Sequence, residues 1–405
     1  MDWPLVRLDS LYNIARGGSP RPIKDFITDD PEGINWIKIG DATASGKYIY
    51  TTKQKIKPEG IQRSRLVKEN DFLLSNSMSF GRPYIMGTTG CIHDGWLVLS
   101  AKDKQVDQDF LYHLLGSPFV FLQFDSLAAG STVRNLNIDL VSGVKIPLIP
   151  IPEQQRIVAI LDQAFADIEK ARANAEKNLK NARELFDSYL NQVFSQRGEG
   201  WVESELGKLG QITSSKRIFK SEYVDAGVPF FRTKEIKQLA NGKTISTELF
   251  ISEEKYNQIK TRFDVPAVGD VLITAIGTIG EIYVVDNAYP FYFKDGNVLW
   301  LKQFNTLKPQ FLKYALMAFV SELNRLSRGA AYNALPIQKL KCYVISFPQI
   351  SEQDEVISKI DAIKDESQKL VGIYSQKIAS LEELKKSLLQ KAFSGELTKT
   401  TGHAA

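Results

Sequence analysis

The stretch PEQQRIVAILD, at residues 152–162, returns in altered form as SEQDEVISKID at residues 351–361, 199 positions further along the chain. At the same offset, DFLLSNSMSFGRPYIM at 71–86 aligns with DVLITAIGTIGEIYVV at 270–285. Two matches in one register, both spanning more than ten residues, are typical of an internal duplication. The sequence therefore predicts that the chain consists of two copies of one unit.

The first part of each copy has the pattern of a mixed α/β domain. Short apolar runs bounded by Gly, Pro, Asn and Asp, such as 34–39 and 271–275, predict strands. Segments 109–115 and 310–319 predict amphipathic helices. Strands and helices are interspersed, so we expect sheets that are covered by helices.

The second part of each copy predicts a long helix. After Pro152 no Gly or Pro occurs until Gly198, and apolar residues recur at steps of four and three. Two helices of about 40 residues, each roughly 60 Å long, need a partner along their length. We expect them to pair with each other in antiparallel directions and to place the two domains at opposite ends. The residues expected to pack between them are Ile157, Leu161, Ile168, Leu179, Phe186, Val356, Ile360, Ile363, Leu370, Leu381, Leu384 and Leu388.

The predicted fold class is α+β, with two tandem α/β domains separated by two long helices that form an antiparallel coiled coil with a pseudo-twofold internal repeat. The expected boundaries are 1–150 and 198–349 for the domains, 151–197 for a central helical spacer, 350–397 for a C-terminal helical spacer and 398–405 for a flexible tail.

Composition argues against several kinds of catalytic or metal site. The chain has 405 residues with only 2 cysteines and 3 histidines, too few for a disulfide framework or a His-rich metal centre. It contains no G-x-x-x-x-G-K-[ST] phosphate loop and no G-x-G-x-x-G after a strand. The start, MDWPLVRLDS, lacks a basic segment followed by an apolar run, so we expect no signal peptide. The most apolar stretch, 271–285, is too short to cross a bilayer, and two cysteines fit a reducing cytoplasm, so we expect no membrane contact and a cytoplasmic location. We expect a non-catalytic chain without its own cofactor or metal.

Local basic patches point to nucleic acid as the ligand. The net charge is only +4, but residues 52–68 hold six basic side chains against one acidic one. Lys and Arg neutralise phosphates, while Arg, Asn, Ser and Thr can also reach base edges. The residues predicted to contact double-stranded DNA are Arg21, Lys24, Lys53, Lys55, Lys57, Arg63, Arg65, Ser75, Asn76, Ser77, Arg82, Arg134, Asn135, Lys216, Arg217, Lys220, Arg232, Lys234, Thr274, Tyr332 and Asn333.

Two other functions stay open at this point. The doubled domains also suit a two-headed adaptor for protein partners that binds no DNA. The tripeptides EIK at 235–237 and EEK at 253–255 fit the short Glu-x-Lys of some nucleases, although such tripeptides are common by chance.

The whole chain resembles the specificity subunit of Type I restriction–modification systems. The resemblance rests on GGSPRP at 17–22, GDVLITAIGTIG at 269–280, GSTVRNLNIDLVSGVKIPLIPIPEQQRIVAILD at 130–162 and LLQKAFSGEL at 388–397. The second copy has GAAYNAL where the first has GSTVRNL, so we do not expect a role equal to that of Arg134 in the second half.

This resemblance implies two target-recognition domains, each reading one half of a bipartite, asymmetric DNA site. It further implies two modification subunits docked on the helices, which bind S-adenosylmethionine and methylate adenine at N6 after flipping it. Two restriction subunits, which use ATP and Mg²⁺, can join such an assembly. These cofactors would belong to the partners.

Overall fold

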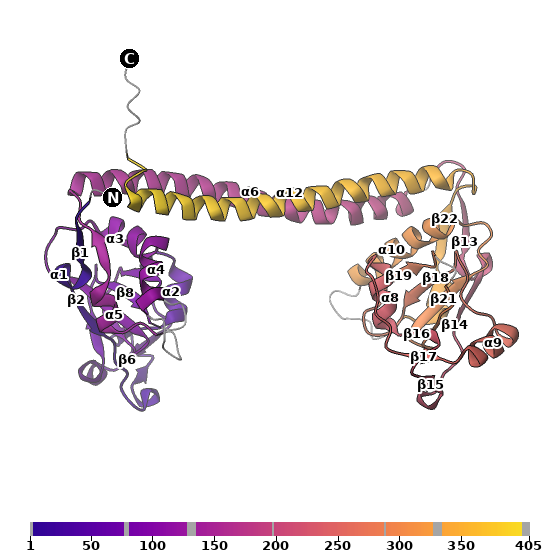
Figure 1. Ribbon diagram of the computed structural model, residues 1–405, viewed down its shortest axis with the longest axis horizontal. Helices are drawn as coiled ribbons and strands as arrows, with labels where there is room; N and C mark the ends of the chain where they lie inside the picture. The colour runs from indigo at the N-terminus through magenta and orange to yellow at the C-terminus, as the bar shows by residue number, and fades with distance from the viewer. Residues whose placement is uncertain are drawn as a thin grey trace, which may run out of the picture. The chain divides into compact units, whose positions relative to one another are not determined.

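The structure is a computed structural model that describes residues 3–76, 81–127, 135–196, 198–286, 289–326 and 334–398 (Figure 1). It contains two compact units, the first made of Met1–Ala175 with Gln376–Ala405 and the second of Glu176–Ser375. Each unit therefore combines one α/β domain with half of each long helix. The expected boundaries, with the two long helices as spacers of their own, stay a prediction.

The first unit holds three sheets. A two-stranded sheet pairs β1 (Leu5–Arg7) with β12 (Lys145–Pro147). One five-stranded sheet has the order β2 (Tyr12–Arg16), β11 (Trp96–Ala101), β8 (Phe72–Ser75), β9 (Pro83–Met86) and β5 (Tyr48–Ile49). The other has the order β3 (Ile27–Thr28), β6 (Gln54–Ile56), β4 (Ile34–Ile37), β10 (Gly90–Ile92) and β7 (Arg65–Val67).

Short helices connect these strands. They are α1 (Leu8–Leu11), η1 (Ile23–Asp25), α2 (Ile39–Ser45), η2 (Pro58–Arg63), α3 (Gln108–Leu115), α4 (Pro118–Leu127) and α5 (Ile138–Gly143). The predicted strand 34–39 ends at Ile37, because the carboxylate of Asp41 accepts the Lys38 N–H at 3.0 Å and starts α2.

The second unit repeats this arrangement. Its sheets have the orders β13 (Val202–Glu205) with β22 (Val344–Phe347); β14 (Gln211–Ser214), β21 (Val298–Lys302), β18 (Val271–Thr274) and β19 (Ile282–Val284); and β15 (Tyr223–Val224), β17 (Phe250–Ile251), β16 (Val228–Phe231) and β20 (Tyr292–Phe293). Its shorter helices are α7 (Leu206–Leu209), η3 (Lys220–Glu222), α8 (Thr233–Ala240), α9 (Glu253–Arg262), α10 (Pro309–Leu326) and α11 (Ile337–Lys341). Apart from the edge strands β5 and β7, which have no counterpart among the described strands of the second unit, the strand order is the same and confirms the duplication that the sequence predicts.

The two long helices, α6 (Ile151–Ser195) and α12 (Gln353–Ser394), lie side by side in antiparallel directions (Figure 1). In the first unit Glu169 pairs with Lys385 at 3.2 Å, and Arg172 pairs with Glu382 at 3.3 Å. In the second unit the Ser367 hydroxyl donates to the carbonyl of Ala182 at 2.6 Å. These contacts confirm the predicted antiparallel pairing, whereas the placement of the domains at opposite ends stays a prediction.

Most residues expected between the helices are covered. Ile157, Leu161, Ile168 and Ile360 are buried, and Leu179, Phe186, Val356, Ile363, Leu370, Leu381 and Leu388 are half-buried. The prediction that Leu384 packs between the helices was wrong, since this residue is 46% exposed. The neighbouring Lys385 is only half-exposed, and its ammonium lies 4.9 Å from the centre of the Phe165 ring.

Each domain is also packed against the final turn of one long helix. In the first unit the Phe393 ring of α12 lies 5.4 Å from the Phe110 ring of α3, inside the largest core cluster. In the second unit the Phe194 ring of α6 lies 5.4 Å from the Phe311 ring of α10. Phe194 and Phe393 are repeat equivalents, so the duplicated helix ends serve the same purpose in the two units.

The duplicated motif at the start of each long helix is a buried amide clamp. Gln154 is fully buried; its amide group donates to the carbonyls of Ile149 at 2.7 Å and Gln105 at 3.0 Å, and its oxygen accepts the Asp107 N–H at 2.7 Å. These contacts join the first turn of α6 to the loop before α3.

Gln353 repeats the clamp in the second unit. It is also fully buried, and it donates to the carbonyls of Pro348 and Thr306 and accepts the Lys308 N–H at 2.8 Å. Eight residues after each glutamine, an aspartate that also repeats between the two copies makes a second link between the long helix and the domain. Asp162 accepts a 2.7 Å hydrogen bond from His113 in the first unit, and Asp361 accepts one from the Tyr314 hydroxyl in the second.

Among the described residues, no helix is both long enough and apolar enough to cross a membrane.

The clamp predicts a specific loss of stability. Gln154→Met keeps the side-chain length but leaves two carbonyls and one N–H buried without their partner. We expect the free energy of unfolding of the first unit to fall by roughly 2–4 kcal/mol, measured by chemical denaturation. Gln155→Met, at an exposed neighbouring position, is the matched control. Equal losses in the two variants would contradict the clamp.

The His113–Asp162 link predicts a dependence on pH. Burial lowers the pKa of the His113 ring, although the hydrogen bond to Asp162 acts in the opposite direction. Because the unfolded chain then takes up the proton first, the stability is fully present above about pH 6.5 and is lost as the pH falls below it. Between about pH 7.5 and 5.5, His113→Gln should lose less unfolding free energy than the native chain, by at most about 1.4 kcal/mol per pH unit. Parallel denaturation curves with equal pH slopes would contradict this.

Candidate nucleic-acid interface

In the first unit a loop and a turn from distant parts of the sequence form one polar junction. The loop is GGSPRP, after β2, and the turn lies between β10 and β11. The Gly17 N–H donates to the Trp96 carbonyl at 2.9 Å, and the Ser19 hydroxyl donates to Asp94 at 2.8 Å. Gly17 has no room for a side chain, because a Cβ there would lie 2.0 Å from the carbonyl oxygen of His93. The junction holds the Arg21 guanidinium 3.6 Å from the Asp94 carboxylate.

The second unit forms the equivalent junction from different residues. Its loop is SSKRIF, after β14, and its turn lies between β20 and β21. The Ser215 hydroxyl donates to the Phe293 carbonyl at 2.6 Å, and Arg217 donates to Asp295 at 2.9 Å. The arginine side chains are 81% exposed for Arg21 and 69% for Arg217.

A large groove borders the first junction. Its volume is about 1530 Å³, and its lining combines the exposed cations Arg21, Lys24 and Lys38 with the apolar side chains of Trp36 and Ile39. The groove gives these cations a common open face, which a polyanion could approach.

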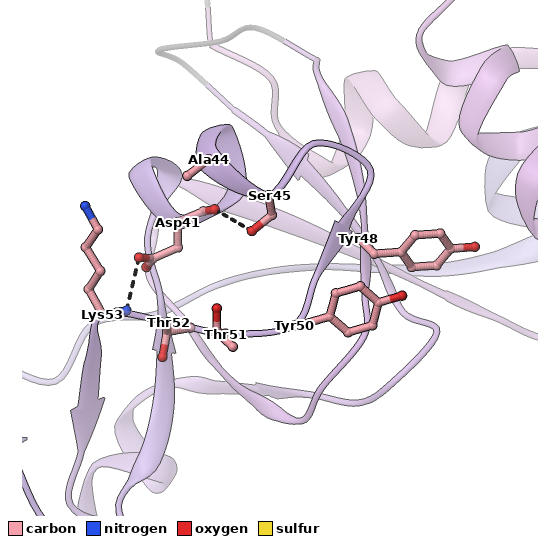
Figure 2. Close-up of a pocket in the computed structure, with 8 residues that line it drawn as sticks. All are labelled: Asp41, Ala44, Ser45, Tyr48, Tyr50, Thr51, Thr52 and Lys53. Atoms are coloured by element: carbon pink, nitrogen blue, oxygen red, sulfur yellow. Dashed lines mark hydrogen bonds between the residues drawn. The ribbon is translucent and has the colours of Figure 1, made fainter. Parts of the chain in front are cut away.

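A smaller hollow of about 380 Å³ lies beside α2 (Figure 2). Its wall is Asp41, which accepts the Lys53 N–H at 3.2 Å, and the stacked rings of Tyr48 and Tyr50, whose centres are 5.8 Å apart. This hydrogen bond holds the backbone of Lys53, while the side chain of Lys53 is exposed and its ammonium group points away from the hollow (Figure 2).

In the second unit a hollow of about 690 Å³ lies along α8. Lys234, Lys237 and Gln238 from α8 line it, together with Lys243 after the helix and Thr278 from the turn before β19. Sequence reasoning missed Lys38, Lys237, Gln238 and Lys243. The repeat contained a signal for one of them, since GK at 46–47 aligns with GK at 242–243.

Ten predicted DNA-contacting residues are exposed and accessible on the surface: Arg21, Lys24, Lys53, Arg63, Arg65, Arg82, Asn135, Lys216, Arg217 and Lys220. Lys57 and Lys234 are exposed as well, but their ammonium groups are bound within the fold. Three of the ten lie over aromatic rings, with Arg63 on Phe26, Arg82 on Tyr84 and Lys216 on Phe263. Their role in binding DNA stays a prediction.

Other predicted residues serve the fold instead. The ammonium groups of Lys55 and Lys57 donate hydrogen bonds to the backbone carbonyls of Pro31 and Asp25, respectively. Ser75 and Thr274 are fully buried, and each accepts a backbone N–H across the turn that follows its strand, from Arg82 at 3.2 Å and Glu281 at 3.0 Å. Asn76, only 2% exposed, donates to the carbonyl of Asp94 at 2.8 Å. These polar side chains replace missing backbone partners at strand ends, so direct base contact by Ser75, Asn76 or Thr274 is not compatible with this structure.

Ser77, Arg134, Tyr332 and Asn333 lie outside the residues that the structure describes.

Arg232 and Lys234 belong to an ion-pair network at the start of α8. Arg232 lies 2.8 Å from both Glu235 and Glu248, and Lys234 lies 3.2 Å from Glu248. The hydrogen bonds to Glu235 and Glu248 raise the pKa of Arg232. Burial acts to raise the pKa of Glu235, but the hydrogen bonds from Arg232 hold it below its ordinary value. Glu235 is 1% exposed, so this carboxylate of the EIK tripeptide caps a helix.

Within the described ranges, no three His, Cys, Asp or Glu side chains gather as metal ligands. Glu253, from the EEK tripeptide, lies exposed in the first turn of α9.

Two α/β units with the same exposed basic junction, joined to paired long helices, define a two-domain recognition protein. The chain belongs to the family of the Type I restriction modification DNA specificity domain, whose model matches residues 1–177 and again 198–379. The two matches follow the duplication that the sequence and the sheet orders show. The protein is thus a specificity subunit of the Type I restriction–modification kind, as the resemblance implied.

Relatives with this name extend over nearly the whole chain. The Type I restriction enzyme MjaVIII specificity subunit of Methanocaldococcus jannaschii is 25% identical, over 98% of this chain and 93% of that relative. Among solved structures, the HsdS subunit from Thermoanaerobacter tengcongensis is 22% identical with a TM-score of 0.66, over 98% of this chain and 97% of that one. A chain from a study of assembly and conformational transition in the type I R-M system is 21% identical with a TM-score of 0.75, over 98% of each chain. At these identities the two structures show a shared fold.

The α8 network predicts different effects for two arginines. Arg232→Leu removes the partner of the buried Glu235 carboxylate and should lower the free energy of unfolding of the second unit by about 2–3 kcal/mol, at the lower end for a buried pair because Arg232 is partly exposed. Arg262→Leu, on the exposed face of α9, is the matched control, because its loss should change stability little. Chemical denaturation of both variants measures the difference. Equal stabilities would show that Arg232 has no structural role.

Proposed function

We propose that this chain recognises a split sequence of double-stranded DNA, with each unit reading one half, and brings it to methyltransferase subunits. The observation that carries the proposal is that the same exposed arginine junction is built twice, on the same strand order, beside surroundings that differ between the units. The groove beside Arg21 and the α8 hollow of the second unit present different side chains. Two different half-sites on one framework require such a combination.

The chain itself needs no catalytic group for this role. We propose that two modification subunits, which would bind S-adenosylmethionine, dock on the helical region and methylate adenine at N6 after flipping it. Two restriction subunits with ATP and Mg²⁺ would complete a cleaving assembly. Membership of the specificity-domain family supports these partners.

Reconstitution with modification subunits tests the proposal. The complex is given a library of random duplexes with S-adenosylmethionine, and the methylated fragments are sequenced. We expect one split motif whose two halves are separated by a fixed, unread gap. Methylation that follows no motif, or binding to the modification subunits without any effect on their DNA choice, would make the chain a protein adaptor. Cleavage of DNA by the purified chain alone would contradict its non-catalytic role.

A further inference from the structure

An Arg-x-x-Lys pair stands at the same place in both units. In the first unit it is Arg21 and Lys24, and in the second it is Arg217 and Lys220. Both pairs follow the serine that anchors the junction loop, and each lysine lies in a short 3₁₀ turn, η1 or η3, just before β3 or β15. All four side chains are exposed.

In both units the arginine is paired with an aspartate from the same turn. Arg21 lies 3.6 Å from Asp94, on the turn before β11, and Arg217 lies 2.9 Å from Asp295, on the turn before β21. The aspartates are better covered than their arginines, with Asp94 48% and Asp295 18% exposed. The Arg217 Nε–H donates to Asp295, which restricts the direction of the remaining N–H groups of Arg217, whereas Arg21 lies at ion-pair distance from Asp94.

The aspartate turns are themselves held in place. The Ser19 hydroxyl donates to the Asp94 carboxylate at 2.8 Å, and this hydrogen bond, against the effect of burial, lowers the pKa of Asp94. In the second unit the N–H of Gly296, next to Asp295, donates to the Ser214 hydroxyl at 3.1 Å. Each arginine therefore lies beside a carboxylate whose own position is set by the fold.

This arrangement suits a base edge better than a phosphate. A phosphate contact needs positive charge, and a neighbouring carboxylate reduces it. Two N–H groups in a fixed plane are what the O6 and N7 atoms of guanine require in the major groove. The adjacent lysine, on a flexible stem, supplies the charge for a phosphate.

Another exposed arginine, Arg82 directly before β9, lacks this symmetry. Arg82 lies 5.3 Å from the centre of the Tyr84 ring, and its repeat equivalent is Glu281. A contact that Arg82 makes in one unit therefore has no counterpart of the same charge in the other.

We infer that Arg21 and Arg217 are equivalent base-reading residues, each recognising a guanine in its own half-site, with Asp94 and Asp295 as positioning residues and Lys24 and Lys220 on neighbouring phosphates. The inference rests on the proposed function and assigns residues to it.

The experiment uses the full chain in complex with its modification subunits. Arg21→Ala and Arg217→Ala complexes are compared with the native one by sequencing the fragments that each methylates. We expect Arg21→Ala to lose the preference for one G·C pair in one half-site, by roughly tenfold or more, and to leave the other half unchanged. Arg217→Ala should do the same in the opposite half.

The lysines and a matched pair of controls separate base contacts from charge. Lys24→Ala and Lys220→Ala should weaken binding to all sequences alike and reduce the slope of log K against log salt by about 1. Lys104→Ala and Lys208→Ala, exposed cations outside the junctions, should change neither the motif nor the slope.

The positioning role has its own readout. Asp94→Asn should relax the same G·C pair as Arg21→Ala, without a change in the other half-site. A lower melting temperature with an unchanged motif would mean that Asp94 is only structural and would overturn its assignment.

Failure of the inference differs from failure of the proposed function. If the native complex selects no motif, the proposed function fails. If the native complex selects a motif but its half-sites contain no G·C pair, or the arginine variants weaken all sequences alike, only the assignment of Arg21 and Arg217 as base readers is overturned.

Discussion

The structure depends on a buried glutamine at the start of each long helix. Gln154 and Gln353 are inaccessible to water, and each joins the first turn of its helix to a loop of the α/β domain through three hydrogen bonds. A buried amide without these partners would be costly, so the direction in which the helix leaves the domain is restricted. Within each unit, the direction in which the long helix leaves the domain sets where α6 and α12 can contact each other in antiparallel directions.

On this common framework the two units differ where they face solvent. The order of the shared strands, the clamps and the paired phenylalanines repeat, whereas His113 in one unit is replaced by Tyr314 in the other against the equivalent aspartate. The exposed hollows diverge further, since one combines cations with Trp36 and the other is lined by lysines of α8. Packing preserves the framework, because buried contacts tolerate few changes, while exposed positions are free to specify different ligands.

Much of the fold could be read from the sequence. The repeated letters and the helical period predicted the duplication, the long helices and their pairing, since apolar stripes of that length must be covered. The candidate site was less predictable. Residue type alone could not separate the exposed Arg21 from Lys55, whose ammonium group is bound to a backbone carbonyl, or from Arg232, which neutralises a buried glutamate. The sequence analysis also names no helix at 233–240, where the structure shows that Glu235, from the tripeptide that fits some nucleases, caps α8.

The amino-acid sequence alone predicts the periodic properties of this protein: two copies, two α/β domains and two helices with matching apolar stripes. These follow from local spacing and composition, which need no knowledge of distant neighbours. Which polar side chains are available to a ligand becomes visible in the folded chain and not before. Asp94 reaches Arg21 across 73 positions of sequence, and Asp295 reaches Arg217 across 78, through strand pairings that close the chain on itself. Availability depends on such long-range contacts, and local sequence patterns do not encode them.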